Sequence, residues 1–317
     1  MNKKQKDAIF VYGWLAWPII HFLVFWLGMN FSMIISSFGS YNIAGEFSFA
    51  KYFGFGNYIE VITDLFKADN VSTTYYNYRA ILNTFSLLPL ALLINLPITL
   101  FFSYCIYKKI MFAKAFEIIL FVPAIISVTV LCLVYSKSLD NDTGIIISLL
   151  KEMGVTVATK RKPGVIPQAG FLGESETQWW FVLIFSIWTG VNGNLIYFQS
   201  AISRLPDSIF ESSELDGASE VRQFFSLALP LVWPTITTMS ITLVGGVFGW
   251  MLPSKMLLPG VFEASTLGLI FLSSTEAGGS TIDVKACALA VLVAVFGGAF
   301  TIGFKTLMDK VTEEVEY

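Results

Sequence analysis

The residues of this 317-residue chain that could do chemistry gather in one polar stretch between two strongly apolar segments. Its letters are Leu205-Pro206-Asp207-Ser208-Ile209-Phe210-Glu211-Ser212-Ser213-Glu214-Leu215-Asp216-Gly217-Ala218-Ser219. Four carboxylates and several hydroxyls lie there, but catalysis by such groups usually needs a partner base. The chain has one histidine, His21, and neither an HExxH nor a GxSxG pattern. An intramembrane enzyme therefore has little support.

The sequence also has no pattern typical of a metal site or a nucleotide-binding site. Cys105, Cys132 and Cys287 lie far apart without metal-ligand spacing, so we interpret them as small buried hydrophobic residues. The nearest approach to a phosphate-binding loop is Gly298-x4-Gly303, where Phe304 stands in place of the lysine. We predict no metal site, no cofactor and no ATP hydrolysis in this chain.

The polar stretch predicts two short helices with a sharp break. Pro206 fits a first helical turn, and Ser208 with Glu211 makes a capping-box pattern. Gly217 is a typical helix stop, after which Ser219 caps the next helix and Glu220 suits its positive end. We call residues 203–231 the elbow. We expect its polar face to have no mate elsewhere in the chain, which makes it a docking knob.

Composition places the rest of the chain in a membrane. Hydrophobic residues make up 55% and charged residues only 14%, whereas soluble domains carry about 25% charged residues. The net charge of −3 argues for no nucleic-acid partner. We expect an all-α integral membrane protein with about six spans, near residues 9–38, 80–107, 116–135, 179–202, 233–258 and 284–304.

Lysines set the expected orientation of these spans. Lys3, Lys4 and Lys6 precede the first span, and three more lysines fill the short turn after the second, so these segments face the cytoplasm. The basic run Lys160–Lys162 opposes this assignment but lies in a longer loop, which weighs less. Both termini and the elbow then share the cytoplasmic side. The expected organisation is a first span with an outer segment (1–79), a five-helix core with the elbow (80–310) and an acidic tail (311–317).

The elbow resembles the EAA loop of binding-protein-dependent ABC importer permeases with a MetI-like transmembrane domain. The family pattern is Glu-Ala-Ala, three residues, Gly, nine residues, then Ile-x-Leu-Pro. Here it reads Glu211-Ser212-Ser213, Gly217 and Leu227-x-Leu229-Pro230, with serines for the alanines and leucine for isoleucine. The run 216–219 and the preceding Leu205-Pro206 resemble the carbohydrate-importer branch. So does the segment 52–58, while the pair Asn83-Thr84 and the run 121–123 resemble the permease family more generally.

The resemblance implies roles and partners. The helix with Glu211, Ser212 and Ser213 would enter a cleft of an ATPase subunit, and Gly217 would permit the turn, flanked by Asp216 and Ala218. The partners would be two ATPase subunits carrying ATP and Mg, a second, different permease, an extracytoplasmic solute-binding protein and the lipid of a bacterial cytoplasmic membrane. The expected function is ATP-driven import of a sugar or oligosaccharide through the 205–230 loop.

Polar residues inside spans are the candidates for the substrate path. Trp188 could stack on a sugar ring, while Asn192 and Asn194 could line a wet cavity, with His21 and Asn95 as further candidates. Hydrogen bonding between helices explains these amides at least as well. A permease for another solute, a secondary carrier and a membrane scaffold remain as alternatives. The absence of paired carboxylates within the spans counts against the carrier.

Overall fold

The computed structural model describes residues 3–41, 46–66, 78–154, 171–175, 177–261, 264–277 and 283–313. The chain forms two compact units. Unit 1 comprises Met1–Phe66 with Ser273–Ala294, and unit 2 comprises Lys67–Leu272 with Val295–Tyr317. The basic run at 160–162 and the end of the acidic tail lie outside the described residues.

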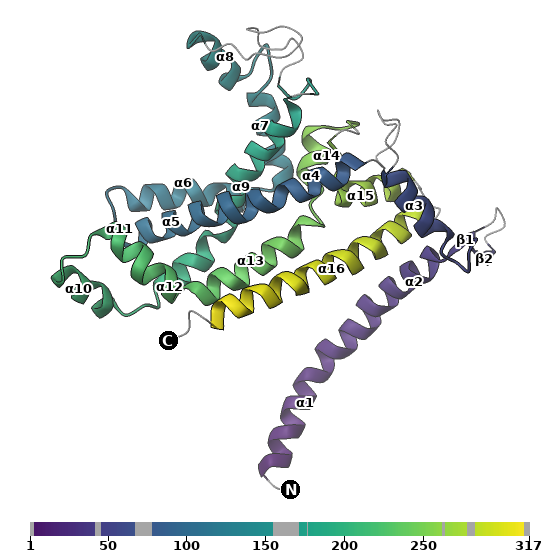
Figure 1. The fold of residues 1–317 in the computed structure, drawn as a ribbon, viewed down its shortest axis with the longest axis horizontal. Helices are drawn as coiled ribbons and strands as arrows, with labels where there is room; N and C mark the ends of the chain where they lie inside the picture. The colour runs from purple at the N-terminus through teal and green to yellow at the C-terminus, as the bar shows by residue number, and fades with distance from the viewer. Residues whose placement is uncertain are drawn as a thin grey trace. The chain divides into compact units, whose positions relative to one another are not determined.

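Unit 1 begins with one continuous helix, drawn in purple in Figure 1. It consists of α1 (Lys3–His21), a π-helical stretch (Phe22–Leu27) and α2 (Gly28–Ser37). Residues Phe10–Ser37 are long and apolar enough to cross a membrane, which confirms the first span, and only 6% of its most apolar window is buried. Within unit 1, few side chains therefore cover this helix.

A short hairpin and a helix follow in unit 1. Strands β1 (Gly39–Tyr41) and β2 (Phe47–Phe49) pair antiparallel, and α3 spans Gly56–Phe66. The hairpin was not predicted, because three-residue strands are too short to show an alternating pattern. The amide of Asn57 donates to the carbonyls of Ser37 (3.0 Å) and Gly39 (2.8 Å), so α3 is fixed to the end of the first span.

Unit 2 holds most of the helices. Its elements, of which α15 and α16 begin or end in unit 1, are α4 (Tyr78–Pro89), a π-helical stretch (Leu90–Asn95), α5 (Leu96–Tyr107), α6 (Ala113–Ile125), α7 (Val128–Ser138), α8 (Ile145–Glu152), α9 (Gln178–Ile202), α10 (Asp207–Leu215), α11 (Glu220–Gln223), a second π-helical stretch (Phe224–Ala228), α12 (Leu229–Leu231), α13 (Trp233–Val247), α14 (Leu252–Leu257), α15 (Leu267–Ala277) and α16 (Val284–Glu313). Helices Tyr78–Tyr107, Gln178–Ile202 and Val284–Val311 are each long and apolar enough to span, which confirms the second, fourth and sixth spans.

The third and fifth spans differ from the prediction, since each is a bent helix pair. Helices α6 and α7 meet at 107°, where Ile126 is extended and the Ser127 hydroxyl caps α7 by accepting from Val130 N (3.4 Å). The segment Glu220–Leu231 meets α13 at 71°, so the elbow itself supplies the start of the fifth span. That span ends at Val247 rather than at residue 258, and α14 and α15 were not predicted.

Gly245 and Gly249 are four residues apart, a spacing that can bring two helices together when both lie on one helix. Gly249 lies beyond the end of α13, so Gly245 and Gly249 do not share a helix face. Close packing occurs instead at Gly268 of α15, where a Cβ atom would lie 3.0 Å from the Trp250 carbonyl oxygen and 3.1 Å from the Gly249 carbonyl carbon. A glycine at 268 lets α15 approach this backbone turn.

Helices α5 and α9 pack along a seam of small and polar residues and lie side by side with α6 in Figure 1. The Thr99 hydroxyl lies 3.1 Å from the Val191 carbonyl oxygen, and the Ser103 hydroxyl lies 3.4 Å from that of Leu195. The Asn95 amide donates to the Ser186 carbonyl at 3.3 Å. Hydroxyls and amides that reach a neighbouring backbone stabilise helix pairs within lipid. Helix α9 leads into the elbow, so this seam fixes where the elbow begins.

We expect Gly190→Ala to loosen this seam. A Cβ atom at 190 would lie 2.2 Å from Asn95 Nδ2 and 2.9 Å from Asn95 Cγ, so the buried amide must move. Overpacking of this kind costs about 1–3 kcal/mol, which thermal unfolding of the purified chain in detergent would register. The double variant Gly190→Ala/Asn95→Ala removes the clash and should recover most of the loss. No recovery in the double variant would contradict the assignment.

Candidate functional site

The elbow turns at Gly217, as the sequence predicts. Gly217 has φ +78°, the Ala218 N–H donates to the Ser213 carbonyl (2.9 Å), and the Gly217 N–H donates to that of Glu214 (3.0 Å). This pair of bonds is the Schellman motif, which requires a left-handed residue at this position. The Ser219 hydroxyl then caps α11 by accepting from Arg222 N (3.4 Å), which confirms the second cap.

The predicted capping box at the start of α10 is wrong. Pro206, not Ser208, is the N-cap residue, and no side chain caps this helix end. Ser208 lies inside the first turn, so its spacing from Glu211 has no capping geometry. The backbone of Pro206 is extended (ψ 127°), so Pro206 lies outside the helix, which begins at Asp207.

The expectation that the elbow's polar face has no mate in the chain is also wrong. Lys108, in the turn after α5, lies 2.9 Å from Glu214 Oε1 and 3.3 Å from Glu220 Oε2. The Tyr107 hydroxyl donates to Asp207 Oδ1 at 2.7 Å. Part of the elbow's acidic charge is therefore neutralised within the molecule, on the side that faces α5.

Charge pairing keeps this contact ionised. Burial lowers the pKa of Lys108, but its bonds to Glu214 and Glu220 together outweigh that effect and raise it. The bond from Lys108 also lowers the pKa of the Glu214 carboxyl. A raised lysine pKa and a lowered glutamate pKa both favour the charged forms, so both groups stay ionised at neutral pH.

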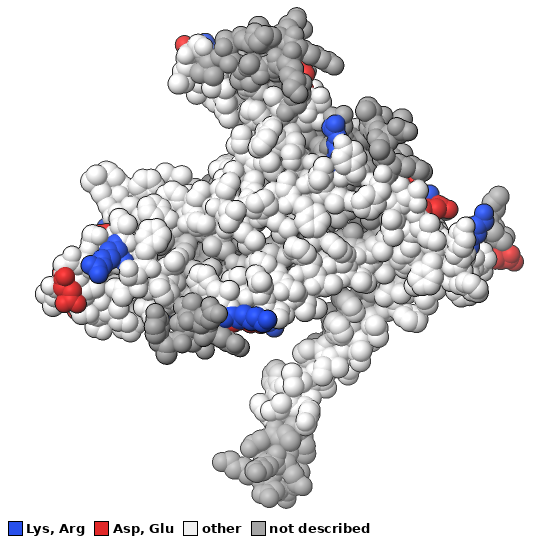
Figure 2. Space-filling view, viewed as in Figure 1, with Lys and Arg blue, Asp and Glu red and all other residues white. Residues whose placement is uncertain are grey.

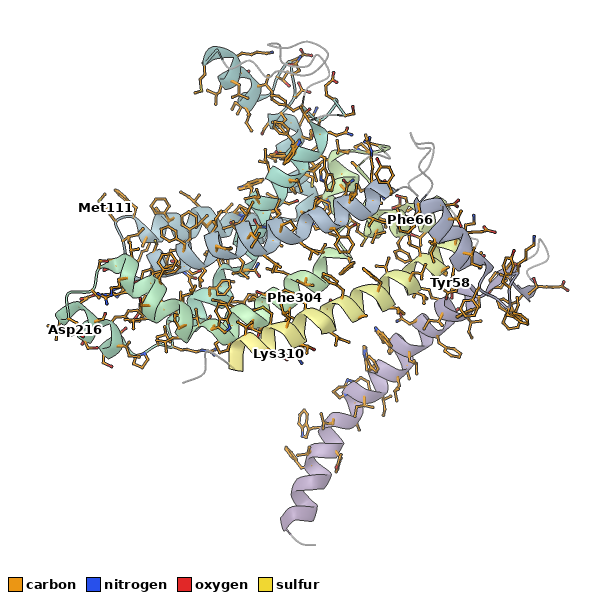
Figure 3. The ribbon with its side chains drawn as sticks, viewed as in Figure 1. Tyr58, Phe66, Met111, Asp216, Phe304 and Lys310 are labelled. Carbon is orange, nitrogen blue, oxygen red and sulfur yellow. The ribbon has the colours of Figure 1, made fainter. Side chains whose placement is uncertain are left out.

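The outward side of the elbow presents a different set of groups. Leu215 is 90% exposed and Val221 is 67% exposed, beside Asp216, which lies at the tip in Figure 3. The hydroxyls of Ser212 and Ser213 donate to the carbonyls of Ile209 (3.0 Å) and Phe210 (2.8 Å) of their own helix. The free surface of the tip is thus apolar with acidic neighbours. Figure 2 shows charged side chains at this end of unit 2 and a mostly uncharged surface along its helices.

The other predicted elbow residues lie on the inner side. Glu211 is exposed and lines a groove of about 770 Å³ together with Glu117, Gln199 and Asp207. Ala218 is half-buried in the turn after Gly217. Leu229 and Pro230 are half-buried in α12, and the Leu229 side chain belongs to an apolar core with Phe210 and Phe224. Leu-x-Leu-Pro is therefore the part of the pattern that attaches the elbow to unit 2.

The candidate path residues of α9 do not form one cluster. Asn192 is buried and donates to the carbonyl of Trp188 (2.8 Å) in its own helix. Trp188 is 41% exposed and its ring lies near those of Tyr135 and Phe185. Asn194 is half-buried and lies two residues after Asn192. That spacing turns it about 200° around the helix from Asn192, so the two amides face different directions.

The two further candidates are also explained by local contacts. Asn95 is buried in the α5–α9 seam, and His21 is exposed on the first span with its ring 4.7 Å from that of Phe25. Among these candidates, Trp188 and His21 are therefore the exposed aromatic groups with a polar atom. The role of the three α9 residues in a substrate path stays a prediction.

Comparison with known proteins gives the fold its family context. No family model matches the chain. The permease protein AraP of an arabinooligosaccharides transport system of Bacillus subtilis (strain 168) is 25% identical over 231 residues, which is 72% of this chain and 66% of AraP. The sn-glycerol-3-phosphate transport permease UgpA of Yersinia pseudotuberculosis serotype I (strain IP32953) is 25% identical over 58% of this chain and 55% of UgpA.

A solved structure covers nearly the whole chain. The crystal structure of a bacterial ABC transporter involved in import of the acidic polysaccharide alginate contains a chain that superposes with a TM-score of 0.76 at 20% identity, over 98% of both chains. The chain therefore has the fold of an ABC importer permease. Its sequence relatives are transport-system permeases, among them carbohydrate permeases. The matched stretch spans less than two thirds of AraP and of UgpA.

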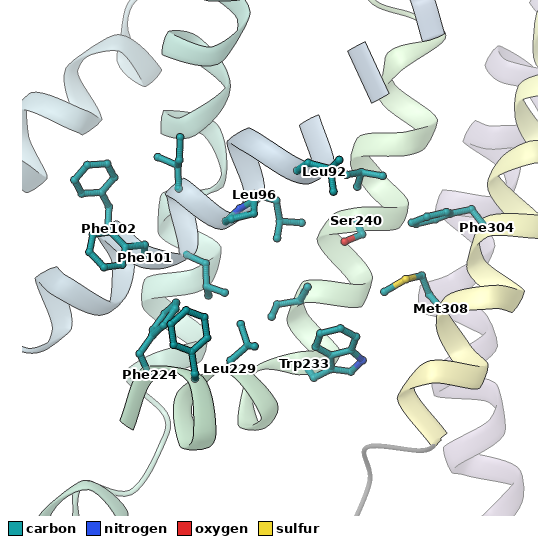
Figure 4. Close-up of a pocket in the computed structure, with 16 residues that line it drawn as sticks. Leu92, Leu96, Phe101, Phe102, Phe224, Leu229, Trp233, Ser240, Phe304 and Met308 are labelled. Atoms are coloured by element: carbon teal, nitrogen blue, oxygen red, sulfur yellow. The ribbon is translucent and has the colours of Figure 1, made fainter. Parts of the chain in front are cut away.

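A large apolar cavity lies in unit 2, and Figure 4 shows its lining. Its volume is about 820 Å³, and Ser240 is the one polar residue among sixteen that line it. A sugar needs several convergent polar groups. This cavity is therefore unsuited to a sugar.

Sequence reasoning missed Tyr104, Tyr107 and Lys108, which hold the elbow from the inside. A signal was present in their spacing. Positions 104, 107 and 108 follow the i, i+3, i+4 pattern of one helix face, and polar groups on one face at the end of an apolar span call for a partner. The partner was not identifiable from spacing alone, because it lies 100 or more residues further along the chain.

Proposed function

We propose that this permease is one transmembrane subunit of an ATP-driven importer for a sugar or oligosaccharide. An extracytoplasmic binding protein delivers the solute, and two separate ATPase subunits, which carry ATP and Mg, drive the elbow. A second, different permease completes the pathway. The complex lies in a bacterial cytoplasmic membrane, with both termini and the elbow on the cytoplasmic side.

One observation carries this proposal: the elbow is a rigid, outward-facing structure at the end of the spans. Its turn has the left-handed Gly217, and its tip exposes Leu215 and Val221. A partner that covered these two side chains would remove their apolar surface from water, which favours docking. The spacing from Glu211 to Pro230 resembles the loop by which importer permeases engage their ATPase. The carbohydrate relative AraP supports a sugar as the solute.

Affinity purification of the permease from native membranes in mild detergent tests the assembly. We expect an ATPase and a second permease to copurify in fixed ratio. In liposomes, the complex with its binding protein should hydrolyse ATP faster when arabinotriose, maltotriose or an alginate trisaccharide is supplied as a panel of probes. A permease recovered alone across several mild detergents contradicts the proposal.

An uncoupler separates the importer from a secondary carrier. Uptake that persists when the proton gradient collapses, with the ATP level held constant, is expected for an ATP-driven importer. Uptake lost under these conditions would favour the carrier, although the described spans place no carboxylate pair where such a carrier would need one.

A further inference from the structure

Lys108 makes three contacts with the elbow. Its ammonium group lies 2.9 Å from Glu214 Oε1, 3.3 Å from Glu220 Oε2 and 5.3 Å from the ring centroid of Phe210. Glu214 belongs to α10 and Glu220 to α11, on opposite sides of the Gly217 turn. One cation therefore holds both helices of the elbow at a fixed angle.

Two tyrosines on the same face of α5 add further attachments. The Tyr107 hydroxyl donates to Asp207 Oδ1 at 2.7 Å, at the start of α10. The Tyr104 hydroxyl donates toward Glu220 Oε2 at 3.2 Å, at the start of α11. We call Tyr104, Tyr107 and Lys108 the clamp. Because the clamp reaches both ends of the turn, the elbow cannot rotate about α5 without breaking several of these bonds.

The clamp lies over a buried aromatic core. Phe210 is 4% exposed, and its ring centroid lies 5.5 Å from that of Tyr107 and 6.4 Å from that of Tyr104. Aromatic packing beneath the polar bonds limits competition by water. The side chain of Lys108 is itself only 15% exposed, although its two carboxylate partners are 55% and 64% exposed.

We propose that Lys108 is a positioning residue that joins the elbow to the span Tyr78–Tyr107, so that a force on the elbow moves this span. The inference rests on the proposed function, since the force would come from the ATPase. Each ion pair with an exposed carboxylate is weak by itself. Here one cation is shared by two carboxylates above a buried ring, with two tyrosines beside it. These groups form a network, and losing the network removes more stabilisation than losing one ion pair.

The neighbouring lysine provides a matched control. Lys109 is exposed and makes no ion pair with any residue that the structure describes. The variants Lys108→Met and Lys109→Met remove the same charge one residue apart. Methionine keeps the length of the lysine side chain and its apolar contact with Phe210, so packing is retained in Lys108→Met. Lys108→Arg restores the charge and should behave as the wild type.

Hydrogen exchange of the α10 amides measures the positioning role without any ATPase. In the purified full-length permease, we expect the α10 amide hydrogens to exchange about fivefold faster in the Lys108→Met variant than in Lys109→Met or Lys108→Arg. Glu214→Gln should act through the same contact, so the double variant Lys108→Met/Glu214→Gln should be little worse than Lys108→Met. Equal exchange in Lys108→Met and Lys109→Met overturns the inference.

Uptake per ATP in the reconstituted complex measures the consequence for transport. The probe is the oligosaccharide of the panel above that stimulates the wild-type ATPase. We expect about a tenfold loss of uptake per ATP in Lys108→Met, with the ATPase still copurifying. Faster exchange with unchanged uptake overturns the inference. If the wild-type complex shows no ATP-dependent uptake, the proposed function itself is overturned. That result needs no variant, so it is distinguishable from a failure of the Lys108 inference.

Discussion

Replacing Gly217 with valine is expected to reduce sugar uptake at least tenfold while the permease still inserts and purifies. Gly217 has φ +78°, and nothing lies within 4 Å of the position that a Cβ atom would take. A side chain therefore meets no neighbour, and the whole effect comes from the backbone. A β-branched residue in the left-handed region costs about 1–2 kcal/mol. The turn would relax, and the Schellman bonds from Gly217 and Ala218 would be lost.

The matched control for this experiment is Gly217→Asn. Asparagine visits the left-handed region far more readily than valine, so this variant should keep the turn and most of the uptake. Both variants add a side chain of similar size to an exposed position. Uptake and ATP hydrolysis are measured together in liposomes, since uncoupling should lower uptake more than hydrolysis. Equal loss in both variants would show that the space at 217, rather than its backbone conformation, is what the elbow needs.

Leu215→Asp is expected to weaken binding of the ATPase subunit at least tenfold. Leu215 is 90% exposed in the isolated permease, so its replacement leaves the permease's own thermal unfolding unchanged. Burying a charge in place of a leucine at a docking surface costs more than about 2 kcal/mol when the site is a hot spot. Copurified ATPase per permease, measured at several salt concentrations, gives the result.

Ser212 and Ser213, which lie on the same helix as Leu215, are expected to contribute little to ATPase binding. The hydroxyls of Ser212 and Ser213 donate to carbonyls of their own helix, and alanine also favours a helix. The double variant Ser212→Ala/Ser213→Ala should therefore bind the ATPase as well as the wild type does. If the serine variant loses most of its copurified ATPase subunit while Leu215→Asp keeps it, the serines rather than Leu215 form the contact surface.

The sequence was sufficient for the parts of the fold that depend on local patterns. Four spans with long apolar runs were predicted within a few residues at most of their boundaries, except that α16 runs further than expected. Gly217 and Ser219 were identified correctly, because a left-handed turn and an N-cap need particular residue types. These signals lie within a few residues of the structure that they determine.

The rest depends on contacts between distant segments. The 107° bend at Ile126–Ser127 does not interrupt the apolar run, since both halves together pass as one apolar span. The partner of Lys108 lies 106 residues away in sequence, and spacing on one helix does not reveal which distant helix covers it. The substrate-path candidates were chosen by residue type, and Asn192 bonds its own helix in a way that type does not show.

The seam between α5 and α9 has an evolutionary consequence. Thr99 and Ser103 of α5 reach backbone carbonyls of α9, at Val191 and Leu195, rather than α9 side chains. Every residue type offers the same carbonyl, so positions of α9 other than Gly190 can exchange their side chains without losing these bonds. The demand for small hydroxyl residues rests on α5 alone. Related permeases could thus diverge along α9, where Trp188 and Asn194 lie, and acquire new solutes while inheriting the same helix pairing.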